Sequence, residues 1–124
     1  MPAYFVIELD VADGPTLADY ERQVTEHVLA AGGRFIVRGN NYVPIEGDWH
    51  PKRLVIVEFP DVDAIVRYYH SEPNQRLKRT RIAGTGGAPA KAVAIEGLVS
   101  VDGSERQSVP KEVGVDASGA VVWG

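Results

Sequence analysis

The stretches Gly32-Gly33-Arg34-Phe35-Ile36-Val37-Arg38-Gly39 and Arg53-Leu54-Val55-Ile56-Val57-Glu58-Phe59-Pro60 decide the fold. Both are rich in valine, isoleucine and phenylalanine, and glycine or proline bounds each of them, which is typical of short strands. We expect them to form one hairpin, joined by a long loop over residues 40–52. Each strand carries a charged residue within its apolar run, Arg38 in the first and Glu58 in the second.

A strand and a helix are predicted before this hairpin. Residues 3–11 alternate, with apolar side chains at every odd position from Phe5 onward, which predicts a strand with one face in a core. A helix is expected to follow as far as about residue 31, with Asp13 or Thr16 as its N-cap. The pair Gly32-Gly33 supplies the flexible backbone that ends a helix.

A second helix, a third helical piece and a last strand are predicted after the hairpin. Asp61 is a suitable N-cap for the second helix, whose buried side is expected to carry Val62, Ile65, Val66 and Tyr69. Pro73 should interrupt this helix near residues 70–71, because proline lacks the amide donor that a helix needs. A short helix over about 72–82 and a strand over about 92–97 complete the order.

The predicted order is strand, helix, strand, strand, helix, strand. It indicates an α+β, ferredoxin-like fold, in which a four-stranded antiparallel sheet carries helices on one face. The other face of the sheet is expected to be apolar, with residues such as Tyr4, Val6, Ile36, Val55 or Val57. Such a face favours a homodimer that forms through the open side of the sheet.

The chain is expected to divide into a domain over residues 1–98 and a C-terminal arm over 99–124. Within the arm, residues 116–119 have the composition of a turn in a small hairpin. Leaving the Val-Val-Trp near the end exposed would be costly, so the arm is expected to pack on its own domain or on the dimer partner. A frayed terminus is the alternative.

Composition narrows the class of protein. The chain has 124 residues, of which 44% are hydrophobic and 24% charged, as expected for one globular domain. Its net charge of -4 argues against a nucleic-acid partner. It has no cysteine, which excludes disulfides and thiolate chemistry. No apolar run approaches the roughly 20 residues that span a membrane, so a cytoplasmic location is the default expectation.

Four motifs stand out within residues 4–97: Arg38-Gly39, Glu46-Gly47-Asp48-Trp49-His50-Pro51-Lys52-Arg53, Glu58-Phe59-Pro60 and Tyr68-Tyr69-His70-Ser71. Together they resemble the DUF1330 family of uncharacterised proteins. The pattern of that family runs Arg-Gly, then Glu-Gly-x-Trp-x-Pro-x-Arg, then Glu-Phe-Pro, then aromatic-Tyr-x-Ser. The chain departs from the family where Glu72-Pro73-Asn74-Gln75 replaces the usual Pro-Glu-Tyr-Gln.

The resemblance implies a dimeric α+β barrel and does not imply a reaction. Related barrels with this fold include cofactor-free monooxygenases, haem-degrading enzymes and lyases that act on small molecules. Because one fold hosts many activities, the function has to be argued from the side chains.

Arg38 and Glu58 are the first candidates for chemistry. Both lie near strand ends of the central hairpin, where residues of neighbouring strands come within reach of each other. The arginine would hold an anion through a planar pair of hydrogen bonds, and a half-buried glutamate would act as a general base. The alternative is an ion pair that ties the hairpin together or bridges the dimer.

The loop and the break between the second and third helices supply further candidates. Trp49 and His50 lie on the loop, and Arg53 lies at its end. Trp49 would form a wall of a pocket and Arg53 would bind an anion there. In the alternative, Trp49 packs over the sheet edge or on a partner subunit. His70 is the best acid–base candidate, because the unperturbed pKa of histidine is near neutrality, although a lone histidine at a helix end is more often a surface cap than a catalyst. The other expected ligand contacts are Tyr4, Tyr69 and Ser71.

The sequence predicts no metal site, because the histidines lack ligand spacing, and it predicts no cofactor. Haem held by one histidine stays an alternative by analogy with the related barrels. A basic run on the third helical piece, Arg76, Lys78, Arg79 and Arg81, suits either an anion site or a solvated face. The first functional hypothesis is therefore a small dimer that binds a partly apolar, anionic metabolite and performs cofactor-free acid–base chemistry, such as isomerisation, cyclisation, a lyase step or oxygenation. The alternatives are a non-catalytic binding module and a structural oligomerisation module.

Overall fold

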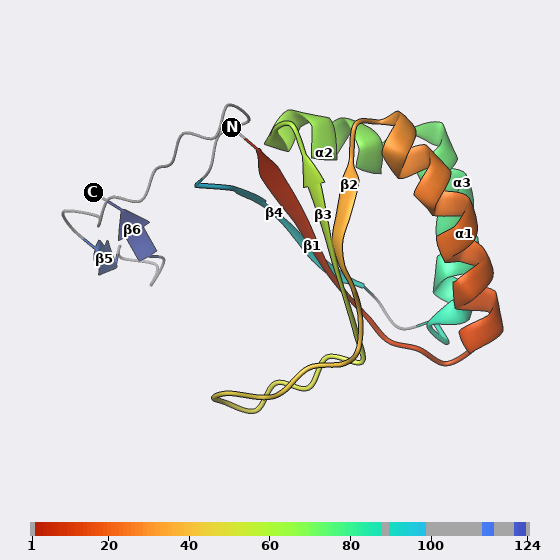
Figure 1. The fold of residues 1–124 in the computed structure, drawn as a ribbon, viewed down its shortest axis with the longest axis horizontal. Helices are drawn as coiled ribbons and strands as arrows, with labels where there is room; N and C mark the ends of the chain where they lie inside the picture. Colours follow the sequence, from red (N-terminus) through yellow and green to blue (C-terminus); the bar gives the residue numbers. More distant parts are fainter. Residues whose placement is uncertain (1, 88–89, 99–112, 116–120, 124) are drawn as a thin grey trace.

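The structure is a computed structural model that describes residues 2–87, 90–98, 113–115 and 121–123. Its main body is one antiparallel sheet of four strands in the order β2-β3-β1-β4, with the helices on one face (Figure 1). The elements in chain order are β1 (Ala3–Leu9), α1 (Gly14–Ala30), β2 (Arg34–Gly39), β3 (Arg53–Phe59), α2 (Val62–Tyr69), α3 (Glu72–Gly84) and β4 (Lys91–Glu96). This arrangement confirms the predicted α+β, ferredoxin-like fold.

Two short strands lie in the C-terminal arm. β5 (Val113–Val115) and β6 (Val121–Trp123) pair antiparallel with each other in a sheet of their own. The predicted turn over residues 116–119 lies outside the described residues. The packing of the arm on the domain or on a partner stays a prediction.

The hydrophobic core lies between the sheet and the helices. Odd-numbered residues of β1 and β3 point into it, because side chains alternate between the two faces of a strand. Val55 and Val57 are almost fully buried there. The expectation that these two valines lie on the open face was wrong. Side chains alternate along β3, and the even-numbered Leu54 and Ile56 are the ones on the open face.

The helix boundaries follow the predicted caps. The Asp13 carboxylate accepts hydrogen bonds from the Thr16 amide at 3.1 Å and the Thr16 hydroxyl at 2.8 Å, so the two candidate residues form one cap. Asp61 accepts from the Ala64 amide at 2.7 Å. α2 ends at Tyr69 and α3 begins at Glu72, as the proline predicts.

The buried side of α2 differs from the expectation. Val66 is exposed, and the buried residues are Ala64, Ile65 and Tyr68. Val62 and Tyr69 are partly buried and pack against the core. Within this two-turn helix the tyrosine that enters the core is thus Tyr68, which the sequence pattern did not single out.

A bulge in β2 sets which of its side chains face the helices. Arg34 is opposite Glu58, but after a register shift Arg38 is opposite Val55. The extra residue of the bulge is Ile36. Residues four apart in a regular strand share a face, whereas one inserted residue puts the later one on the other face. Arg34 therefore faces the open side of the sheet and Arg38 faces the helices.

α1 and α3 pack closely where Gly84 ends α3. The Gly84 carbonyl accepts hydrogen bonds from the amides of Ala12 and Asp13, both at 3.0 Å. A Cβ atom at this position would lie 3.0 Å from the backbone nitrogen of Leu17. This contact involves backbone, which cannot rotate away as a flexible side chain would.

Gly84→Ala is therefore expected to destabilise the protein by about 1–3 kcal/mol, the usual range for overpacking. The matched control is Gly14→Ala, at the first residue of α1, where an added Cβ meets nothing within 4 Å. Urea unfolding of the two variants at the same protein concentration measures the difference. Equal stability of the two variants would refute the close packing at Gly84.

Within the described residues, no helix is long and apolar enough to cross a membrane.

Candidate functional site

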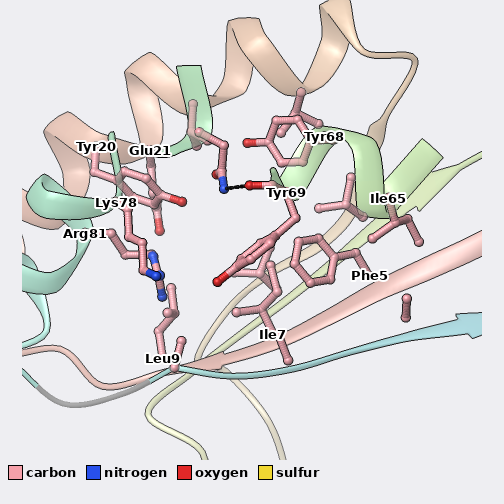
Figure 2. Close-up of a pocket in the computed structure, with 18 of the residues that line it drawn as sticks. Phe5, Ile7, Leu9, Tyr20, Glu21, Ile65, Tyr68, Tyr69, Lys78 and Arg81 are labelled. Atoms are coloured by element: carbon pink, nitrogen blue, oxygen red, sulfur yellow. Dashed lines mark hydrogen bonds between the residues drawn. The ribbon is translucent and has the colours of Figure 1, made fainter. Parts of the chain in front are cut away.

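A cavity of about 630 Å³ lies between the helix-facing side of the sheet and the helices. Figure 2 shows side chains from the sheet and from the helices converging on it. Its sheet side is apolar and is formed by Phe5, Ile7, Leu9, Val55 and Val57. An apolar surface of this kind suits the body of a small organic molecule.

The helix side and the edge of the cavity carry charge. Arg38 reaches it from β2, and Lys78 and Arg81 reach it from α3. Glu21 on α1 is the carboxylate among its lining residues. Since that carboxylate is already bound to Arg53, the three cations are not neutralised by it.

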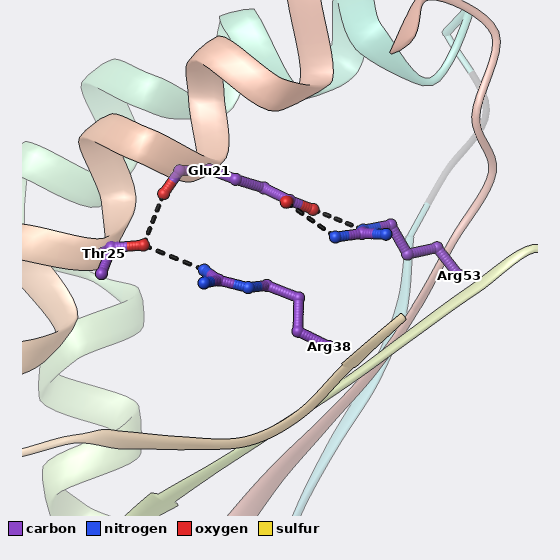
Figure 3. A network of polar contacts seen from close by, with 4 residues as sticks. All are labelled: Glu21, Thr25, Arg38 and Arg53. Atoms are coloured by element: carbon purple, nitrogen blue, oxygen red, sulfur yellow. Dashed lines mark hydrogen bonds and ion pairs between the residues drawn. The ribbon is translucent and has the colours of Figure 1, made fainter. Parts of the chain in front are cut away.

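The Glu21 side chain joins α1 to β3 through a two-point ion pair, shown in Figure 3. Arg53 Nε donates to one carboxylate oxygen and Arg53 Nη2 donates to the other at 2.7 Å. The two side chains are 18% and 21% exposed, for Glu21 and Arg53 respectively. Arg53 is thus held as a partner of Glu21 at the wall of the cavity rather than projecting into it.

Arg38 is held by two neighbouring groups. Its Nη1 donates to the Thr25 hydroxyl at 2.9 Å, and that hydroxyl donates to the Glu21 carbonyl at 2.6 Å (Figure 3). The guanidinium carbon also lies 4.3 Å from the centre of the Phe35 ring. Because Thr25 engages only one part of the guanidinium, Arg38 keeps donors for an anion.

Tyr69 and His70 form a second wall at the end of α2. The ring of Tyr69 meets Phe5 edge-on at 6.4 Å between centres and meets the His70 ring edge-on at 5.1 Å. Lys78 Nζ lies 6.0 Å from the centre of the Tyr69 ring. In Figure 2 the Tyr69 hydroxyl points toward the side of the cavity where Arg81 lies.

Two further tyrosines, Tyr20 on α1 and Tyr68 on α2, line the cavity. Burial raises the pKa of Tyr20, and the positive charge of Arg81 opposes this rise. Burial also raises the pKa of Tyr68 well above its usual range, with a smaller contribution from Tyr20 and an opposing one from Arg81. Both phenols are therefore neutral hydrogen-bond donors at physiological pH.

The first two predicted catalytic residues do not come together. Glu58 lies on the open face, where it pairs with Arg34 at 3.0 Å and accepts a hydrogen bond from the Tyr4 hydroxyl at 3.3 Å. Partial burial, followed by the negative charge of Glu58, raises the pKa of Tyr4. The expectation that Arg38 faces Glu58 across the hairpin was wrong, because the β2 bulge puts them on opposite faces of the sheet.

The remaining predicted site residues divide between the cavity and other places. His70 and Tyr69 line the cavity together with Arg38. The Ser71 hydroxyl donates to the Tyr68 carbonyl at 2.6 Å, which holds the turn between α2 and α3. Trp49 and His50 lie on the loop, where Trp49 is 58% exposed and His50 pairs with Asp48 at 3.1 Å.

His50 and Arg53 do line a second hollow, of about 530 Å³, next to the loop. Glu21 lines both hollows, so its ion pair with Arg53 stands between them. Trp49 lines neither of the two. A contact of Trp49 with a partner subunit stays a prediction.

Most of the residues that line the cavity were not among the predicted site residues, and they include Tyr20, Tyr68, Lys78 and Arg81. The sequence could have predicted that Lys78 and Arg81 line the cavity together, because residues three apart share one face of a helix. Arg76, in the same basic run, instead pairs with Glu72 at 3.8 Å. Some residues of the basic run therefore line the cavity and others lie on a solvated face. The sequence had left an anion site and a solvated face as alternatives, and the run contributes to both.

No group of three or more histidine, cysteine, aspartate or glutamate side chains that could hold a metal ion occurs in the part of the chain that the structure describes.

The chain belongs to the family described as "Domain of unknown function (DUF1330)", whose model matches residues 2–98. The comparison with curated proteins gave no significant sequence match. Family membership thus agrees with the resemblance carried by the four motifs and brings no activity with it.

Solved structures with the same fold include proteins of unknown function and an oxygenase. One is a protein of unknown function from Rhodopseudomonas palustris, with 18% identity and a TM-score of 0.62 over 78% of this chain and 82% of that chain. A dimeric ferredoxin-like protein of unknown function from Jannaschia sp. CCS1 has 14% identity and a TM-score of 0.64, over 77% and 99%. A variant of SnoaB, a cofactor-independent oxygenase from Streptomyces nogalater, has 15% identity and a TM-score of 0.50, over 81% and 96%.

Proposed function

We propose that the protein binds a small, partly apolar anion in the cavity between the sheet and the helices. One observation carries this proposal: three cationic side chains, Arg38, Lys78 and Arg81, border an apolar cavity of about 630 Å³. The apolar floor supplies binding energy through burial of the ligand body. The cations supply selectivity, because arginine matches the planar geometry of a carboxylate.

Acid–base chemistry on the bound molecule is the finer form of this proposal. His70 lines the cavity and is the candidate that would take or give the proton. Glu58 faces away from the cavity and has no part in it. A protein with the same fold is described as a cofactor-independent oxygenase, which supports cofactor-free chemistry as a possibility for this fold. A non-catalytic binding module remains the alternative, and the absence of turnover of an identified ligand would favour it.

We also propose that two copies pair through the open face of the sheet. The pairing register aligns Val37, Ile56, Val6 and Val93 in one apolar row across all four strands. Val37 and Val93 are exposed in the single chain. The Jannaschia protein with the same fold is described as dimeric, which supports this arrangement.

The loop over residues 40–52 would extend that contact. Figure 1 shows it leaving the sheet on the side away from the helices. It carries exposed apolar side chains, among them Ile45, which is 91% exposed, together with Val43 and Trp49. In a dimer formed through the open faces, these side chains would pack on the partner.

The binding proposal is tested with 2-naphthoate, an apolar carboxylate, and its neutral analogue 2-naphthamide. Isothermal titration calorimetry of the wild-type protein is expected to give at least about tenfold tighter binding of the carboxylate, the value of one hydrogen bond to a charged group. Arg38→Met is expected to remove much of this preference.

The matched control is Arg34→Met. Arg34 lies on the same strand, but it faces the open side and pairs with Glu58. This variant should bind 2-naphthoate as the wild type does. Failure of the wild-type protein to bind 2-naphthoate, or equal weakening by the two arginine substitutions, would contradict the proposed site.

A further inference from the structure

Thr25 on α1 fixes one end of the Arg38 side chain. The Thr25 hydroxyl has a single proton, which it donates to the Glu21 carbonyl at 2.6 Å. Toward Arg38 it can therefore only accept, and Arg38 Nη1 donates to it at 2.9 Å (Figure 3). Thr25 is half-buried and does not line the cavity itself, so any effect that it has on a ligand there has to pass through Arg38.

The remaining donors of Arg38 form one free edge. Among the described residues, Thr25 is the hydrogen-bond partner of this guanidinium, and the bond uses Nη1. The Phe35 ring, with its centre 4.3 Å from the guanidinium carbon, restrains the group from a second direction. Nε and Nη2 are left, and together they present two parallel N–H donors in one plane. Arg38 is exposed and lines the cavity, so this edge is open to a ligand.

Arg53 shows what such an edge binds in this protein. Its Nε donates to one oxygen of the Glu21 carboxylate, and its Nη2 donates to the other at 2.7 Å. Arg38 and Arg53 both face the helices, because Arg38 is opposite Val55 and Arg53 lies two residues before that valine on β3. One turn of α1, from Glu21 to Thr25, thus holds two neighbouring arginines by different atoms. Arg53 is occupied on its Nε–Nη2 edge, whereas Arg38 is held at Nη1 and keeps that edge free.

We infer that Thr25 is a positioning residue, which holds Arg38 so that its Nε–Nη2 edge binds a ligand carboxylate in the cavity. The ligand carboxylate is held as Arg53 holds the Glu21 carboxylate, with one oxygen on each donor. Lys78 and Arg81, which border the same cavity, add positive charge without this planar geometry. The inference rests on the proposed function, and it specifies which atoms recognise the ligand and what orients them.

Thr25→Val tests the positioning role, because it removes the hydroxyl and keeps the shape of the side chain. The measured quantity is the ratio of the dissociation constants of 2-naphthamide and 2-naphthoate, obtained by isothermal titration calorimetry. This ratio is expected to fall about two- to tenfold, because the released guanidinium has to be ordered when the ligand binds. Thr25→Ser keeps the hydroxyl and should retain the wild-type ratio. Thr80→Val is the matched control, since Thr80 lies on α3 and does not line the cavity, and it should leave the ratio unchanged.

Arg38→Lys tests the binding edge. Lysine keeps the positive charge but replaces the planar pair of donors with one ammonium group. The ratio is expected to fall about tenfold, the value of one hydrogen bond to a charged group, so that this variant resembles Arg38→Met. In the Arg38→Met background, Thr25→Val should have no further effect on the ratio, because Thr25 acts through Arg38.

These outcomes separate the inference from the proposed function. A wild-type ratio in Thr25→Val, equal losses in Thr25→Val and either Thr25→Ser or Thr80→Val, or a further loss in the Arg38→Met background would overturn the positioning role. A wild-type ratio in Arg38→Lys would overturn the binding edge. In each of these cases the wild type still binds 2-naphthoate and the proposed site stands, whereas no binding by the wild type would overturn both.

Discussion

Ile56→Glu should convert the proposed dimer into a monomer. Ile56 lies in the central strand β3, in the middle of the apolar row that crosses the open face, next to Val6 and Val37. In the proposed dimer this side chain lies in a dry interface. An unpaired charge there would raise the dissociation constant by at least roughly a hundredfold, because desolvating an isolated carboxylate is very costly.

Size-exclusion chromatography with light scattering measures this change directly. The variant should still fold, because the helix side of the sheet, with Val55 and Val57, forms the core of the single chain. Leu29→Glu is the matched control: Leu29 is exposed near the end of α1, away from the open face, and this variant should remain a dimer. A wild-type protein that is monomeric at micromolar concentration would refute the proposed dimer.

Arg53→Met should lower the free energy of unfolding by about 2–3 kcal/mol. This substitution leaves the Glu21 carboxylate, which is only 18% exposed, without its two-point partner. Breaking one side of a buried pair costs more than the pair contributes as a whole, because a charge stays behind in a poorly solvated place. Adding Glu21→Gln to Arg53→Met removes that charge and should restore part of the stability.

The comparison pair is Asp19 with Arg22, one turn apart on α1. Their ion pair at 3.1 Å is largely exposed, so Arg22→Met should cost no more than about 0.5 kcal/mol. Urea unfolding at one fixed protein concentration gives the free energies of unfolding of the wild type and the three variants. The concentration has to be fixed because dimerisation would add to the apparent stability. Equal losses for Arg53→Met and Arg22→Met would show that the Glu21 pair behaves as a surface pair.

The fold was predictable because glycine and proline punctuate the sequence at the ends of its elements. Gly32-Gly33 separates α1 from β2, and Pro73 marks the break between α2 and α3. Apolar alternation in β1 and the caps Asp13 and Asp61 place the remaining boundaries to within about two residues. These are local signals, and local signals suffice for the order of the elements.

The candidate site was predictable only in part, because side-chain direction depends on contacts that are distant in sequence. Arg38, Tyr69 and His70 do reach the cavity. Glu58 does not, since the even-numbered residues of β3 face the open side of the sheet. The bulge that turns Arg38 to the helix side lies in β2 and has no distinct signature in the sequence. Tyr68 was missed because the register of a two-turn helix is fixed by the sheet beneath it rather than by its own pattern.

The bulge at Ile36 has a consequence for how β2 can change. Before it, even-numbered positions such as Arg34 belong to the open face, and after it odd-numbered positions such as Val37 do. The alternation of side chains between the two faces is therefore reversed within this one strand, which supplies an arginine to each side of the sheet. Arg34, on the proposed partner surface, and Arg38, at the proposed ligand site, can therefore be substituted independently, although only three residues separate them.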